Sequence, residues 1–181
     1  RLQPKGWDTP NFDDSSWQSP KVYTYPDGRL QAYPGTQVTE RERLKPVEIT
    51  EPKPDVYVFD LGKNIAGIAE LQVQGPEGTA IKLEYGEILK EDGTILKANL
   101  RKARATDTYI LAGDGEEIWQ PKFTYHGFQF VQVTGLPSEP DEETITAIVL
   151  SSIDVDGSTF EVSNAMNNQL YENIKTTQSA N

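Results

Sequence analysis

Short apolar and β-branched runs, separated by turn residues, make up most of the chain. Runs with strand character cover 22–25, 37–50, 56–61, 68–73, 79–85, 106–111, 122–125, 128–134 and 144–152, with 155–160 as a further candidate. Turn signals such as Pro26-Asp27-Gly28 and Asp156-Gly157 stand between or beside them. About ten short strands with turns every 8–12 residues are typical of an antiparallel β-sandwich or jelly roll. The pattern therefore predicts a mainly β fold.

Two local patterns refine this prediction. Glu and Arg alternate over 40–43 inside the first long β-branched stretch, which suits a solvated antiparallel strand or a sheet edge. Asp92-Gly93 lies between the apolar pairs 88–89 and 95–96, and this arrangement predicts a hairpin turn.

Only the last segment, 163–181, has the periodicity of a helix. Met166, Leu170, Tyr171 and Ile174 fall on one helical face, and Ser163 or Asn164 is the candidate N-cap. An isolated helix of this length is marginal in water, so its stability must come from packing this apolar stripe. We expect the stripe to meet the sandwich on one side and a partner domain on the other.

The first twenty residues are rich in turn formers but also contain Trp7, Phe12 and Trp17. These rings are too apolar for a free tail, so we expect them to pack on a neighbouring surface. Sealing a sheet edge is favoured over stacking on a sugar, and both interpretations stay open. The predicted organisation is a tail of a preceding β-sandwich domain or an edge segment over 1–20, a β-sandwich over 21–162 and a helix over 163–181.

Composition excludes several classes of function. The chain has 28 acidic and 17 basic residues, a net charge of −11, and no cysteine. Such a surface repels nucleic acid phosphates and anionic lipid, and a disulfide or thiolate metal site is impossible. No apolar run approaches the ~20 residues of a membrane span. We therefore expect no nucleic acid partner and no membrane partner.

A search for catalytic chemistry finds little. His126 is the single histidine, and no G-x-S-x-G, G-x-G-x-x-G or P-loop motif is present. A turn or interface role for His126 is favoured over that of a general base. Asp154 to Gly157 resembles half of a calcium loop, but the spacing of a full loop is missing and a β-turn explains it better. The sequence therefore predicts no catalytic residue, no metal ligand and no cofactor.

A glycosidase needs two carboxyl groups facing each other across a sugar. Glu84 and Glu87 are the nearest candidates, but their spacing puts them on opposite faces of a regular strand unless Gly86 forms a bulge. Asp60 and Glu70 have no partner that the sequence reveals. A self-contained acid–base pair is therefore disfavoured.

Three segments together resemble a known family: VFDLGKNIAG at 58–67, ATDTYILAG at 105–113 and WQPKFTYHGFQFVQVTG at 119–135. In this order they resemble the concanavalin-like β-sandwich region of bacterial α-L-rhamnosidases, glycoside hydrolase family 78. The resemblance runs from about residue 30 to residue 181. The matching positions are Asp60, Leu61, Gly62, Asn64, Gly67, Gly86, Glu87, Leu89, Asp92, Gly93, Thr106, Asp107, Tyr109, Pro121, Phe123, Tyr125, Gly127, Phe128, Val131, Phe160, Ser163, Asn164, Asn168 and Leu170. The chain departs from the family at Lys63, where Gln is frequent, and at Gln129, where Arg is frequent.

The resemblance implies a β-sandwich segment without catalytic residues from an enzyme that hydrolyses terminal α-L-rhamnosyl residues with inversion. In this family the acid and base lie in a catalytic helical barrel, an (α/α)6 domain, beyond the position of Asn181, so residues 163–181 would be a linker to that partner domain. Most motif residues are expected to be structural, namely Asp60, Gly62, Asn64, Gly67, Glu87 and Asp107. Gly62 and Gly67 would allow sharp turns, and Asn64 would bond its own backbone. Tyr125, His126 and Phe128 are candidate contacts at the domain interface or the rim of a rhamnoside-binding cleft, because loops at one end of a sandwich carry contacts.

Two other functions remain open. An independent carbohydrate-binding module needs exposed aromatic rings, which Trp7, Trp17, Tyr23, Tyr25 and Tyr33 could supply. A complete small jelly-roll glycosidase would need a close carboxylate pair in a cleft. The compartment of this bacterial type of protein, cytoplasmic or exported, is left undetermined.

Overall fold

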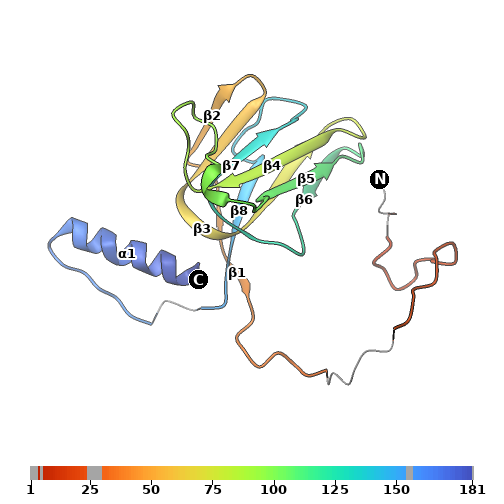
Figure 1. The fold of residues 1–181 in the computed structure, drawn as a ribbon, viewed down its shortest axis with the longest axis horizontal. Helices are drawn as coiled ribbons and strands as arrows, with labels where there is room; N and C mark the ends of the chain where they lie inside the picture. Colours follow the sequence, from red (N-terminus) through yellow and green to blue (C-terminus); the bar gives the residue numbers. More distant parts are fainter. Residues whose placement is uncertain (1–3, 5, 24–29, 154–156, 181) are drawn as a thin grey trace. The chain divides into compact units, whose positions relative to one another are not determined.

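The computed structural model describes residues 4, 6–23, 30–153 and 157–180. They form two units, Arg1–Gly35 and Thr36–Asn181. The second unit contains, in chain order, β1 (Thr39–Leu44), β2 (Glu48–Lys53), β3 (Val56–Gln74), β4 (Ala80–Gly86), the 3-10 turn η1 (Ala98–Leu100), β5 (Thr106–Ile110), β6 (Glu116–Trp119), β7 (His126–Thr134), β8 (Ile145–Ser151) and α1 (Ala165–Ser179) (Figure 1). Parts of the strands predicted at 22–25 and 155–160, and of the turns at 26–28 and 154–157, lie outside the described residues.

Strand β3 is the central strand of the sheet and pairs with four others. Its first half pairs with β2 and β7, and its second half pairs with β8 and β6. The pairing with β7 shifts register between Asp60 and Ile65, and Gly62 has a positive φ of 75° at this point. Two separate strands were expected at 56–61 and 68–73. One continuous strand forms instead, because pairing with β7 resumes at Ile65 after the bulge.

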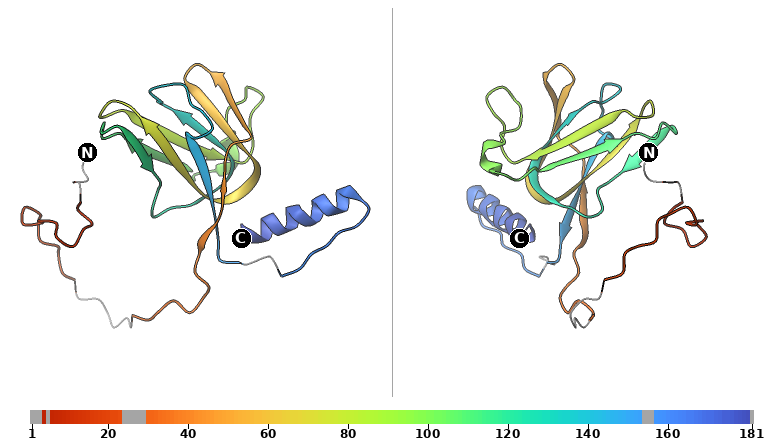
Figure 2. Two further views of the ribbon diagram at one scale, coloured as in Figure 1. Left: turned by 180° about the vertical axis from the view of Figure 1, so that it is seen from behind. Right: turned by 45° about the vertical axis from the view of Figure 1, so that its right-hand side comes forward.

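The sheet therefore folds over into two layers, as the curved path of β3 shows in Figure 1. The strands follow the order β1-β8-β3-β7-β4-β5, and β2 and β6 both pair with β3. Alternate side chains point into the space between the layers, including Phe59, Leu71, Leu83, Val131 and Ala147. Both views in Figure 2 show this folded sheet. The predicted mainly β, antiparallel sandwich is confirmed.

The predicted edge strand divides into β1 and β2, with Pro46, which has no N–H to donate, between them. β1 lies at one end of the strand order and is exposed along almost its whole length. Arg43 pairs there with Glu40 at 2.7 Å and with Glu70 on β3 at 2.8 Å. The alternating charges thus mark a sheet edge, as expected.

Two other strand predictions change. No strand forms at 122–125, where Phe123 is completely exposed and the chain only connects β6 to β7. The predicted hairpin at Asp92-Gly93 is a tight turn with a single antiparallel bridge between Leu89 and Ile95. Gly93 has φ 77°, and the Lys90 N–H donates to the Thr94 carbonyl at 2.8 Å.

Helix α1 begins as the sequence indicates. Of the two candidate caps, Asn164 is the N-cap, and its Oδ1 accepts hydrogen bonds from the N–H groups of Met166 and Asn167. No helix in the described part of the chain is long and apolar enough to cross a membrane.

In the first unit, Phe12 and Trp17 pack with their ring centroids 5.3 Å apart. Trp7 and Trp17 nevertheless remain exposed within that unit.

Candidate functional site

Side chains from three strands meet in one polar cluster, formed by Tyr85 on β4, Asp107 on β5 and His126 on β7. The Tyr85 hydroxyl donates to Asp107 Oδ2 at 2.8 Å, and His126 Nε2 lies 3.1 Å from the same oxygen. The rings of Tyr85 and His126 stack with centroids 4.1 Å apart. Asp107 is therefore the centre of the cluster, and its two neighbours fix its position.

The electrostatics of this cluster keep Tyr85 protonated. Burial raises the pKa of Tyr85 far above its usual range, and the negative charge of Asp107 raises that pKa further. The hydroxyl is therefore a permanent donor to the carboxylate at any ordinary pH. Because Asp107 contacts both Tyr85 and His126, this group can brace the end of the sandwich.

A second polar contact joins two motifs that are distant in the sequence. Asn64 Nδ2 donates to Glu87 Oε1 at 3.0 Å, which links the bend of β3 to the loop after β4. Asn64 was expected to bond its own backbone, but Asp60 has that role, because its Oδ1 accepts from the Gly62 N–H at 2.7 Å. The same Asp60 oxygen accepts from Gln129 Nε2 at 2.9 Å. The bend is thus held by side chains from three segments.

The candidate contact residues differ sharply in accessibility. Tyr125 is 71% exposed and has a free ring surface, and the His126 side chain is mostly buried beside Asp107. Phe128 is completely buried and lies edge-on to Tyr85, with ring centroids 4.9 Å apart. Phe128 therefore belongs to the core and was wrongly expected at an interface or cleft rim. Its position on the inward face of β7 explains the burial.

The structural role of Gly67 also differs from expectation. Its φ is not in the left-handed region, so it makes no sharp turn of the kind found at Gly62. A Cβ at Gly67 would instead lie 2.1 Å from the carbonyl oxygen of Ile148 on β8. Glycine is needed there because two backbones approach closely.

The two glutamates considered as an acid–base pair have separate partners. Glu87 binds Asn64, whereas Glu84 is buried and pairs with Lys82 at 2.7 Å and with Lys97, and it accepts from Gln132 at 3.0 Å. Burial alone would raise the pKa of Glu84, but hydrogen bonds and charge from the two lysines outweigh this, so its pKa is lowered. Sequence reasoning missed this cluster, although Lys82 two residues earlier on the same strand face was an available signal.

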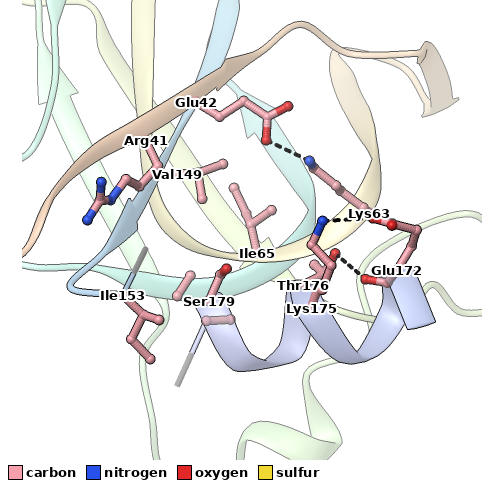
Figure 3. Close-up of a pocket in the computed structure, with 12 residues that line it drawn as sticks. Arg41, Glu42, Lys63, Ile65, Val149, Ile153, Glu172, Lys175, Thr176 and Ser179 are labelled. Atoms are coloured by element: carbon pink, nitrogen blue, oxygen red, sulfur yellow. Dashed lines mark hydrogen bonds and ion pairs between the residues drawn. The ribbon is translucent and has the colours of Figure 1, made fainter. Parts of the chain in front are cut away.

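A cavity of about 430 Å³ lies between α1 and the sheet (Figure 3). Its walls carry Arg41, Glu42 and Lys63 from the sheet side and Glu172 and Lys175 from α1. Lys63, one of the two departures from the family pattern, pairs with Glu42 at 2.7 Å, and Lys175 lies 3.6 Å from Glu172. The helix therefore turns a polar face toward the sandwich.

The apolar stripe of α1 is left open by this arrangement. Met166, Leu170 and Ile174 are 79%, 56% and 58% exposed. The expectation that the stripe would meet the sandwich is wrong, because Glu172, Lys175 and Thr176 occupy that side. Tyr171 is the exception in the predicted stripe, since its hydroxyl donates to the Ser158 carbonyl at 2.9 Å.

No three His, Asp or Glu side chains lie together in a way that could hold a metal ion within the described ranges. Glu84, Glu87 and Asp107 each bind other side chains of the same chain. What the arrangement offers chemically is a rigid, hydrogen-bonded end of a sandwich, an exposed tyrosine and an uncovered apolar helix face.

Comparisons with known proteins agree with this picture. The family model described as "Bacterial alpha-L-rhamnosidase concanavalin-like domain" matches residues 50–151. An α-L-rhamnosidase of Streptomyces avermitilis is 40% identical over all of this chain, which covers 18% of that protein. One of Formosa agariphila is 33% identical over 96% of this chain, which covers 19% of it.

Solved structures give the same result. The α-L-rhamnosidase from Dictyoglumus thermophilum superposes with a TM-score of 0.92 and 34% identity over 99% of this chain, which covers 20% of that chain. The α-L-rhamnosidase from Aspergillus terreus superposes with a TM-score of 0.88 and 35% identity over 98% of this chain, which covers 21% of it. The chain thus spans about a fifth of the length of the relatives it matches.

Proposed function

We propose, because this chain belongs to the family of bacterial α-L-rhamnosidase concanavalin-like domains, that it is a supporting β-sandwich domain of an α-L-rhamnosidase. In this proposal the whole enzyme hydrolyses terminal α-L-rhamnosyl residues of glycosides with inversion. Its general acid and general base come from a helical-barrel domain of the same polypeptide. Residues 163–181 form the linker that leads toward that domain.

The observation that carries the proposal is the open apolar face of α1. Met166, Leu170 and Ile174 lie on one side of the helix and are exposed, whereas the polar side faces the cavity next to the sheet. A helix of this length gains its stability from burying such a stripe. A neighbouring helical domain would cover it and so define the angle at which the sandwich supports the catalytic domain.

The state of the acidic residues supports a bracing role. Inverting glycosidases hold their two carboxyl groups about 6.5–9.5 Å apart around a water molecule. Here Glu84 is paired with Lys82 and Lys97, and Asp107 accepts a hydrogen bond from Tyr85 and lies 3.1 Å from His126 Nε2. Tyr125, exposed beside this braced end, is the residue we assign to the interface or the cleft rim.

Hydrolysis of an aryl α-L-rhamnoside tests the proposal. The 181-residue chain alone should release no aryl alcohol. Release that disappears in Glu84→Gln or Glu87→Gln would show that the chain holds its own acid or base, and the proposal would be abandoned.

The exposed Trp7 and Trp17 favour one alternative, an independent carbohydrate-binding module. A titration of tryptophan fluorescence with L-rhamnose separates the two functions. The supporting-domain proposal expects no saturable change. A saturable change that is lost in Trp17→Ala would favour the binding module.

A further inference from the structure

A second cavity, of about 310 Å³, lies beside the loop that connects η1 to β5. This volume is at the lower end of the range for small-ligand sites. Its charged lining consists of three cations, Lys82, Lys97 and Arg104, and one acid, Glu84. Leu100 and Ala103 add apolar wall. The cavity thus combines a small apolar surface with an excess of positive charge.

The charge balance of the cavity is positive by two. Glu84 is shared by Lys82 and Lys97, so it can neutralise only one of them. No ion pair joins Arg104 to any residue in the described part of the chain. Residues 97–105 contain four cations and no acid, in a chain whose net charge is −11. A positive cavity is therefore a local exception on an acidic protein.

Buried groups hold the loop at both of its ends. Before it, the Ile95 side chain is buried, and its N–H donates to Gln132 Oε1 at 3.1 Å. After it, the Tyr85 N–H donates to the Ala105 carbonyl at 3.0 Å. Glu84 also pairs with Lys97, the residue just before η1. A site held in this way loses little conformational entropy when it binds a ligand.

We propose that this cavity binds the carboxylate of an acidic sugar, a uronate unit of the carbohydrate on which the whole enzyme acts. Arg104 presents a planar fork that can hold a carboxylate with two hydrogen bonds, and Lys82 and Lys97 add positive charge beside it. Leu100 and Ala103 offer an apolar surface to the C–H groups of the ring. The sugar part of this inference rests on the proposed function, whereas the anion part rests on the cavity alone.

A ¹H–¹⁵N NMR titration of the 181-residue chain tests the site, with D-glucuronate and D-galacturonate as probes. D-glucose and D-galactose are the neutral counterparts, and inorganic sulfate is the generic anion. We expect saturable shifts in residues 97–106 with at least one uronate. The neutral sugars should cause no saturable shift, and sulfate should bind more than about tenfold more weakly than the uronate.

Arg104→Gln and Arg101→Gln form a matched pair of variants, because each removes one arginine charge from the same exposed loop, and only Arg104 lines the cavity. Arg104→Gln should weaken uronate binding by about tenfold. Arg101→Gln should change it by less than about twofold. Far-UV circular dichroism and the melting temperature verify that both variants keep the fold.

Each other outcome overturns the inference. Equal weakening by both variants would show a diffuse charge effect, and equal binding of sulfate and uronate would show a simple anion site. Absence of saturable uronate shifts up to a Kd of about 10 mM would show that the cavity binds no acidic sugar. Each of these results leaves the rhamnosidase assignment intact, because that proposal is tested by turnover and by rhamnose binding.

Discussion

At Gly67 the chain has no room for a side chain, since a Cβ would lie 2.1 Å from the Ile148 carbonyl oxygen. We predict that Gly67→Val lowers the free energy of unfolding by about 1–3 kcal/mol, because overpacking forces β3 and β8 apart. Urea denaturation measures this. Gly157→Ala is the control, because a Cβ there meets nothing within 4 Å, and its effect should stay within about 0.5 kcal/mol. Equal stability of Gly67→Val and the parent would contradict the close approach.

Glu84 should make the stability of the fold depend on pH. Its pKa is lowered in the folded state, so its stabilising effect is complete above the unfolded value of about 4.3 and is lost as pH falls through the folded value. Glu84→Gln should therefore reduce the free energy of unfolding at pH 7, and the difference from the parent should shrink in acid. A difference that is constant from pH 7 to about pH 3 would show that the ionised carboxylate is not what stabilises the fold.

The Tyr85 hydroxyl should contribute more to the stability of the fold than the Tyr109 hydroxyl does. Tyr85→Phe leaves the part-buried Asp107 without its 2.8 Å donor, and we expect a loss of about 1.5–3 kcal/mol in the free energy of unfolding. Tyr109→Phe is the matched control. Its hydroxyl donates to Glu117, which also accepts from the N–H groups of Ala112 and Gly113. Thermal unfolding should rank the two variants in this order, and the reverse order would show that the Tyr85–Asp107 bond adds little.

Among the elements, α1 has a capped N-terminus but little packing along its length. Asn164 caps the helix, but the apolar stripe remains exposed. Amide hydrogen exchange should therefore be faster throughout α1 than in β7, and Asn164→Ala should speed it further, by an amount equivalent to about 1 kcal/mol. Exchange as slow in α1 as in β7, in a verified monomer, would show that the helix needs no partner, and the linker proposal would be dropped.

Local patterns predicted the elements that depend on local chemistry. The Asn164 cap, the turn at Asp92-Gly93 and the exposed edge strand β1 follow from residue types within a few positions. The continuous β3 did not, because a bulge in the middle of a strand looks like a loop between two strands in the sequence. Periodicity also marked Met166, Leu170 and Ile174 on the apolar face of α1 but could not say what that face meets.

The candidate site was the least predictable part, because its contacts join distant segments. Asn64 and Glu87 are 23 residues apart, and Asp107 meets Tyr85 and His126 from two other strands. Asn64, Glu87 and Asp107 were identified from family motifs and Tyr85 was not singled out, because the pairing depends on register, which one sequence does not give. The location of Phe128 was predicted wrongly for this reason, since one step along β7 decides whether a side chain faces the core or the surface.

For the whole molecule, the open apolar stripe and the net charge of −11 have opposite effects on self-association. The stripe formed by Met166, Leu170 and Ile174 favours pairing of two chains, and charge repulsion opposes it. Salt shortens the Debye length from about 10 Å at 0.1 M to about 3 Å at 1 M. We therefore predict that self-association of the isolated chain increases with salt concentration, as measured by light scattering after size-exclusion chromatography.

The triple variant Met166→Ser, Leu170→Ser, Ile174→Ser should remain monomeric at every salt concentration, because it removes the apolar area that drives pairing. The matched control replaces three exposed apolar residues outside α1, Val38→Ser, Val47→Ser and Ile118→Ser, and it should associate like the parent. Loss of association in the control as well would mean that general surface hydrophobicity drives it. A parent that stays monomeric at 1 M salt would show that the stripe is too small to hold a partner without further contacts, and α1 would then be an ordinary surface helix.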